Sequence, residues 1–149
     1  MNPDPRRLDA AFYPLKVSIL ARYADVDPLW HINNVAMAQY YEEARVSAAM
    51  SMMGGERIPT PTGGRILIVH QSIDYLSEAS YPGALEIGIG VLQIGNSSWR
   101  FGMAMFQDGA CVSVSEAVLV YAEALGPAAL PDDYRRRLEG WLMPELAGD

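Results

Sequence analysis

The sequence predicts an α+β protein in which an antiparallel sheet of five strands wraps around one long central helix, with a short helix near the C-terminus. Residues 33–53 read as a helix that is apolar around most of its circumference, so other parts of the chain must cover it. Four strand-like runs follow, and tight turns join the last three. A twisted sheet curled around the helix would hide these apolar positions, whereas a flat sheet would leave the helix half exposed.

The first strand is predicted over residues 13–23, where Val17, Ile19 and Ala21 occupy every second position. An Asp-Pro pair at 27–28 follows it. The residue before a proline is held extended, and aspartate readily forms a turn with its own side chain. The segment between this strand and the helix is therefore expected to turn sharply.

The long helix is predicted to begin at Asn33, which can cap it, and to run to residue 53, where a Gly-Gly pair stops it. Alanine, methionine, glutamate and arginine fill it, and all of these favour helices. Apolar residues repeat at helical spacing at Met37, Tyr41, Ala44, Ala48 and Met52. This stripe is expected to face the sheet.

A loop with two prolines is expected over residues 56–64. The chain then becomes strand-like at 66–76, 84–94, 97–107 and 110–122. Gly95-Asn96 and Asp108-Gly109 are two-residue turn sequences, so the last three runs form a meander. Residues 131–142 begin with Pro-Asp-Asp and form the short amphipathic helix.

Composition and charge exclude several functions. The chain carries 11 Lys and Arg against 18 Asp and Glu, and this net charge of −7 is opposite to that of a nucleic-acid-binding surface. Cys111 is the only cysteine, so no internal disulfide can form and no zinc-ligand spacing is present. Signal-peptide and membrane-span patterns are also missing. We expect a cytoplasmic protein of one domain, residues 1–149, with a flexible tail over residues 1–11 and no nucleic-acid or membrane partner.

The most informative segment lies between the first strand and the helix, where residues 22–34 read RYADVDPLWHINN. On an extended strand, Asp25 and Asp27 would face the same side. A helix start presents unpaired N–H groups and a partial positive charge, so it can hold an oxyanion while a carboxylate acts on water. From the residues alone, Asp27 could also be a turn residue, and His31 could be bonded to nearby backbone.

Other chemistries lack their motifs. No serine lies in a Gly-x-Ser-x-Gly elbow, and the two histidines offer no catalytic-triad order. Gly88 and Gly90 do not form a phosphate loop, because they lie inside the strand at 84–94 and are expected to leave room for the helix or for an acyl chain. Glu43 and Arg45, charged residues in the middle of the helix, are expected at a subunit boundary.

Six motifs together resemble a known family. In chain order they are YADVD at 23–27, HINN at 31–34, YYEEAR at 40–45, IDYL at 73–76, IGNSS at 94–98 and LPDDYR at 130–135. Their order and spacing resemble the hotdog-fold thioesterases, in the branch of 4-hydroxybenzoyl-CoA thioesterase and the short bacterial acyl-CoA thioesterases. The resemblance covers nearly the whole chain. It implies the hotdog fold and a homodimer or homotetramer in which subunits share the site.

The resemblance also implies which residues act. The second aspartate of the family's Tyr-x-Asp-x-Asp motif is catalytic, and it corresponds to Asp27. Plant acyl carrier protein thioesterases have asparagine where this chain has Leu29, so an asparagine-assisted mechanism is not expected. Many bacterial relatives have glycine where this chain has Trp30, which is far larger and tolerates positive φ poorly. The expected site is catalytic Asp27 and His31, an oxyanion site at Asn33 and Asn34, and a substrate pocket of Trp30, Met37 and Tyr41.

The expected activity is hydrolysis of acyl thioesters of coenzyme A or acyl carrier protein, with Asp27 as general base or nucleophile and with no metal or other cofactor. Two alternatives stay open. One is a hotdog hydratase or dehydratase that acts on acyl-CoA through Asp27 and His31, which hydration of crotonyl-CoA would reveal. The other is a non-catalytic acyl-ligand-binding module in which Trp30 keeps water out, which tight acyl-CoA binding without thiol release would reveal.

Overall fold

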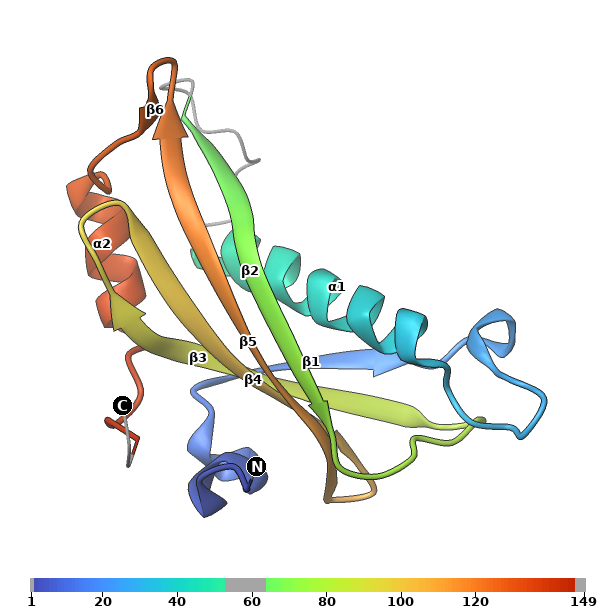
Figure 1. Ribbon diagram of the computed structural model, residues 1–149. Coiled ribbons are helices and arrows are strands. Elements are labelled where there is room, and N and C mark those ends of the chain that lie inside the picture. The colour runs from blue at the N-terminus through green and yellow to red at the C-terminus, as the bar shows by residue number, and fades with distance from the viewer. Residues whose placement is uncertain (1, 53–63, 147–149) are drawn as a thin grey trace.

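The computed structural model describes residues 2–52 and 64–146 and has the predicted α+β architecture. The strands pair in the order β1-β3-β4-β5-β2, every neighbouring pair is antiparallel, and β6 pairs with β5. Figure 1 shows the curved sheet with α1 along one of its faces. The strands and α-helices are β1 (Leu15–Leu20), α1 (Asn34–Met52), β2 (Arg65–Tyr75), β3 (Ala84–Ile94), β4 (Ser98–Gln107), β5 (Ala110–Glu123), β6 (Gly126–Pro127) and α2 (Asp132–Glu139).

The larger hydrophobic core lies between α1 and the sheet. Alternate residues of β3 enter it and are almost completely buried, namely Leu85, Ile87, Ile89 and Val91. Ala44 and Ala48 of α1 are fully buried in the same core, and their small side chains let the helix lie close to the sheet. Each fully buried leucine or isoleucine contributes about 1.5–3 kcal/mol relative to an exposed one. This packing fixes α1, and with it the position of the helix start.

The opposite face of the sheet carries a smaller core, made of Tyr13, Ala104, Phe106, Val114 and Met143. A Cβ atom at Gly88 would lie 2.6 Å from the ring of Tyr13, and one at Gly90 would lie 2.6 Å from the sulfur of Met143. These glycines therefore make room for segments near the two termini. The expectation that they leave space for the helix or an acyl chain was wrong, because they face away from α1.

The N-terminal segment also differs from the flexible tail expected over residues 1–11. Two 3-10 turns, η1 (Pro5–Leu8) and η2 (Ala10–Phe12), lie against the sheet. Arg7 is 7% exposed; its Nη1 lies 3.1 Å from Glu116 Oε1, and its Nη2 donates to the Ser115 carbonyl at 3.0 Å. The sequence around Arg7 does not predict this burial, because its partner Glu116 lies 109 residues away.

The element boundaries agree closely with the predictions in the meander, where β3 matches residue for residue. The first strand is shorter than predicted, because β1 ends at Leu20 and the chain forms the 3-10 turn η3 (Tyr23–Asp25). The last helix ends at Glu139, three residues before the predicted end. The predicted helix end at 53 and nearly all of the loop at 56–64 lie outside the described residues. None of the described helices is both long and apolar enough to cross a membrane.

Candidate active site

The loop between β1 and α1 is closed around Asp27. The Asp27 N–H donates to the His31 carbonyl at 2.8 Å, and the Trp30 N–H donates to the Asp27 carbonyl at 3.0 Å. The side-chain oxygen Oδ1 of Asp27 accepts the N–H groups of Leu29 at 2.9 Å and of His31 at 3.1 Å. Its second oxygen, Oδ2, accepts no hydrogen bond from any residue that the structure describes. Oδ1 thus holds the loop in its conformation through two hydrogen bonds, and Oδ2 is available to react with a substrate or with water.

The start of α1 lies next in the chain and is capped as predicted. Asn33 Oδ1 accepts the Ala36 N–H at 2.8 Å, and the Asn33 carbonyl accepts the Met37 N–H at 3.1 Å. The Asn33 N–H donates to the Asp25 carbonyl within the loop. Within residues 2–52 and 64–146, the N–H groups of Asn34 and Val35 find no acceptor. Two free N–H groups at a helix start can hold an anion.

These two features border one cavity of about 310 Å³, named here the helix-start cavity. Asp27 is half-buried at its edge. The end of β2 closes another side, where the Tyr75 hydroxyl donates to the Asn34 carbonyl at 3.3 Å. The residues around the cavity include Asp27, His31, Asn34, Met37, Tyr75 and Glu78. The structure therefore brings together four of the seven residues that the sequence predicted.

His31 lies close to Glu78, a residue that the sequence did not predict to belong to the site. Its Nε2 lies 3.0 Å from Oε2 of Glu78, whose side chain is 71% exposed at the cavity rim. A backbone bridge between His31 and Ser80 holds the two segments together. Glu78 is 47 positions from His31 in the sequence and belongs to no motif, so only the fold reveals it.

Asp25 takes a supporting position outside the cavity. It is buried, and its carboxylate accepts hydrogen bonds from Arg22 and from the Tyr40 hydroxyl. The bonds from Arg22, and then the one from Tyr40, lower the pKa of Asp25 despite its burial. Its carbonyl accepts the Asn33 N–H at 3.0 Å. The expectation that Asp25 and Asp27 face the same side was wrong, because the turn at Tyr23–Asp25 rotates Asp25 inward.

Tyr41, predicted to line the substrate pocket, lies in the core instead. It is fully buried, and its hydroxyl is 2.7 Å from Ser113 Oγ. Burial raises the pKa of this hydroxyl far above its ordinary value. Helical spacing placed Tyr41 with Met37 on one stripe, but the cavity reaches only the first turn of α1, where Met37 lies.

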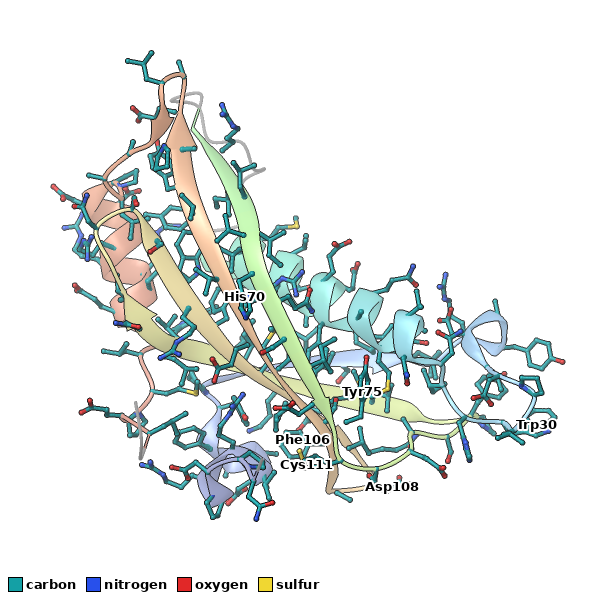
Figure 2. The ribbon with its side chains drawn as sticks, in the orientation of Figure 1. Trp30, His70, Tyr75, Phe106, Asp108 and Cys111 are labelled. Atoms are coloured by element: carbon teal, nitrogen blue, oxygen red, sulfur yellow. The ribbon has the colours of Figure 1, made fainter. Side chains whose placement is uncertain are left out.

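Trp30, the other residue predicted for the substrate pocket, lies outside the helix-start cavity. It is 56% exposed and has a φ of 65°, which is the left-handed region. Figure 2 shows it at the outer end of the loop. It lines a second hollow of about 450 Å³ with Tyr23, Ala24, Val26, Asp27 and Pro28, named here the aromatic hollow. The loop keeps the backbone conformation of a glycine although tryptophan occupies the position.

Replacing Asn33 with alanine is expected to lower the free energy of unfolding by about 1 kcal/mol, because the Ala36 N–H loses its side-chain acceptor. Urea unfolding of the two proteins measures this difference. Asn34→Ala is the matched control, since the structure gives Asn34 no side-chain hydrogen bond and alanine favours helices. Equal stability of the two variants would contradict the cap.

Comparisons with known proteins show the family and the fold of the chain. A family model described as the thioesterase-like superfamily matches residues 21–138. None of the curated proteins compared with the chain matches it. No group of three or more His, Cys, Asp or Glu side chains within the described ranges is placed to hold a metal ion.

Solved structures are similar over most of the chain. A protein from Pseudomonas aeruginosa is 26% identical with a TM-score of 0.81, covering 91% of this chain and 96% of its own. A thioesterase from Thermus thermophilus, complexed with coenzyme A and Zn, is 26% identical with a TM-score of 0.75, covering 87% and 95%. A 1,4-dihydroxy-2-naphthoyl-CoA thioesterase from Synechocystis shares the fold at 17% identity, with a TM-score of 0.74 and coverage of 83% and 93%.

Proposed function

The chain belongs to the thioesterase-like superfamily, and from this we propose that it hydrolyses acyl thioesters of coenzyme A or acyl carrier protein to a free acid and a thiol. The observation that carries the proposal is the carboxylate of Asp27 at a cavity that the start of α1 also borders. The coenzyme A bound to the Thermus relative supports coenzyme A as one carrier. The motifs favour the 4-hydroxybenzoyl-CoA thioesterase branch within the superfamily.

In the first proposed route, Asp27 acts as a general base. Its Oδ2 takes a proton from water, and the water oxygen attacks the thioester carbonyl carbon. The carbonyl electrons move to oxygen, and the free N–H group of Asn34, which borders the cavity, stabilises the resulting oxyanion. Collapse of the tetrahedral intermediate breaks the C–S bond, and the proton that Asp27 took passes to the leaving sulfur, either directly or through His31.

In the second proposed route, Asp27 acts as a nucleophile. Oδ2 attacks the carbonyl carbon, the C–S bond breaks, and a mixed anhydride remains on Asp27 until water hydrolyses it. Both routes use the same oxygen, which must be ionised and free of hydrogen bonds from the protein.

A thiol-release assay over a panel of acyl-CoAs and acyl carrier protein conjugates tests the proposed activity. Hydration of crotonyl-CoA and acyl-CoA binding are measured in parallel. Release of thiol with an equal amount of free acid supports hydrolysis. Hydration alone, or tight binding with no thiol released, would contradict it.

We further propose that the protein forms a homodimer or homotetramer through the edge of β2, the last strand of the sheet. Leu67, Ile68 and Val69 are 43–60% exposed there. A groove of about 600 Å³ lies beside them, lined from α1, β2 and β5. Arg45 lines this groove and is 6% exposed, and its Nη1 has no partner in the part of the chain that the structure describes. Burial lowers the pKa of Arg45, and a second copy would supply acceptors and cover the edge.

Replacing Val69 with lysine is expected to shift the protein towards the monomer, because the charge would have to be buried between two strand edges. Light scattering at a fixed protein concentration measures the mass. Leu125→Lys is the control, since Leu125 is fully exposed in the turn between β5 and β6. A monomeric wild-type protein, or an unchanged mass for Val69→Lys, would contradict the proposed edge contact.

A further inference from the structure

Two aromatic side chains, Tyr23 and Trp30, line the aromatic hollow, and a third, Tyr81, contacts Tyr23. The ring centroids of Tyr23 and Trp30 are 6.2 Å apart, and those of Tyr23 and Tyr81 are 5.9 Å apart. Tyr23 is 69% exposed and Trp30 is 56% exposed, so both present ring surface to solvent. Asp27 lines this hollow and the helix-start cavity, so the aromatic group lies directly beside the proposed reacting carboxylate.

The backbone at Trp30 is strained. Among the described residues only Trp30 and Asp108 are non-glycine residues with positive φ, and Asp108 lies in a hairpin turn where aspartate tolerates it. The Trp30 N–H donates to the Asp27 carbonyl, and the Trp30 carbonyl accepts from the Tyr81 N–H. Glycine could make both bonds without strain. The indole contacts the Tyr23 ring but is still 56% exposed, so burial recovers little of this cost, and a ligand that covers the indole would recover more.

We propose that the aromatic hollow binds a flat aromatic ring of the substrate, stacked against Trp30. Aromatic rings attract one another in offset or edge-on arrangements at centroid distances of about 4.5–7 Å. The neighbouring carboxylate and the net charge of −7 favour a neutral ring over an anionic group. This inference rests on the proposed function, because two parts of a thioester substrate could supply the ring: an aromatic acyl group, or the adenine of coenzyme A.

The test measures binding by tryptophan fluorescence, so it does not depend on turnover. Wild-type protein is titrated with coenzyme A and with pantetheine, which lacks the adenine together with its ribose and the phosphates. The Asp27→Asn variant, used to avoid hydrolysis, is titrated with benzoyl-pantetheine and with butyryl-pantetheine. In the first pair, the part of the preference that is lost when Trp30 is replaced reports on adenine, because the phosphates are the same for both proteins. The second pair reports on an acyl ring. The chain has three tryptophans, of which Trp99 is 2% exposed and Trp141 is partly buried. Both remain in Trp30→Gly, so quenching that this variant loses comes from Trp30.

We expect the ring-bearing ligand of at least one pair to bind about tenfold more tightly than its ring-free counterpart and to quench fluorescence. Trp30→Gly, which removes the ring and the strain, is expected to abolish that preference. Leu29→Ala is the matched control, because it removes a side chain that is 71% exposed in the same loop but carries no ring, and it should keep the preference.

Equal binding within both pairs, or a preference that survives in Trp30→Gly, would overturn the proposal. Conversion of an oligomer to a monomer by Trp30→Gly would also overturn it, since the ring would then serve a subunit contact. Failure of the proposed hydrolysis is separable, because it would appear as missing thiol release whatever the ring preference is.

Discussion

Replacing Asp27 with asparagine is expected to lower kcat for acyl thioester hydrolysis by about a thousandfold, within the range for loss of a general base. The amide oxygen can still accept the N–H groups of Leu29 and His31, so the loop should keep its conformation. The free oxygen Oδ2 is replaced by an amide nitrogen that can neither take a proton from water nor attack a carbonyl. Thiol release at saturating substrate measures the loss.

Asp133→Asn is the matched control for this variant. Asp133 is an exposed residue in the first turn of α2, which Figure 1 places on the opposite side of the molecule from the β1–α1 loop. The same chemical change there should leave kcat unaltered. Activity of Asp27→Asn within a few-fold of the wild type would contradict the assigned role, provided that its circular dichroism spectrum and unfolding midpoint are unchanged.

Replacing Asp25 with alanine is expected to lower the free energy of unfolding by about 2–3 kcal/mol, because a buried network loses its acceptor. The carboxylate is 6% exposed and accepts both Arg22 bonds at 2.9 Å. Its loss also removes the acceptor of the Tyr40 hydroxyl, which is buried beside it. Urea unfolding at pH 7 measures the difference. The rate of thioester hydrolysis should fall as well, since the hydrogen bonds of Asp25 fix the position of the loop that carries Asp27.

The effect of Asp25 depends on pH in a defined direction. Hydrogen bonds from Arg22 lower the pKa of Asp25 below its value in the unfolded chain, which is about 4. A lowered pKa in the folded state adds stability above the unfolded pKa, and this stability is lost as the pH falls through the folded pKa. The difference between wild type and Asp25→Ala should therefore be full at neutral pH and should narrow below about pH 4.

Arg22→Gln distinguishes the contribution of the Arg22–Asp25 ion pair from that of the Asp25–Tyr40 hydrogen bond. The Arg22 side chain is 66% exposed, so solvent screens its ion pair with Asp25, and the pair is expected to contribute little to stability. The bond between Asp25 and Tyr40 remains in this variant. If Arg22→Gln destabilised the protein as much as Asp25→Ala, the buried carboxylate would not be the main contributor.

The sequence predicts most of the fold because its signals are local. Alternating apolar residues and short turns define the meander, and β3 begins and ends where predicted. The turn at Asp108-Gly109 has two residues as predicted, whereas the turn between β3 and β4 has three, residues 95–97. Asn33 caps α1 as the residue type and its position indicate. These features depend on neighbours within a few positions, which is the range over which a sequence pattern reports directly.

The predictions that were wrong concern residues whose contacts are distant in the sequence. Arg7 is fixed by Glu116, and Asp25 turns inward to reach Tyr40, so neither the N-terminal segment nor the end of the first strand could be read from local pattern. Helical spacing assigned Tyr41 and Met37 to one face but could not show that the cavity stops at the first turn. The sequence predicts Trp30 in the substrate pocket, but in the structure it has a positive φ and lines the adjoining hollow.

The central claim is that the Asp27 carboxylate, beside the start of α1, supports cleavage of an acyl thioester. Free thiol released from the acyl-CoA and acyl carrier protein panel, measured together with the free acid, tests it most directly. We expect equal amounts of thiol and acid from at least one member with the wild-type protein, and almost none with Asp27→Asn. No thiol from any member, or equal release by both proteins, would contradict the claim.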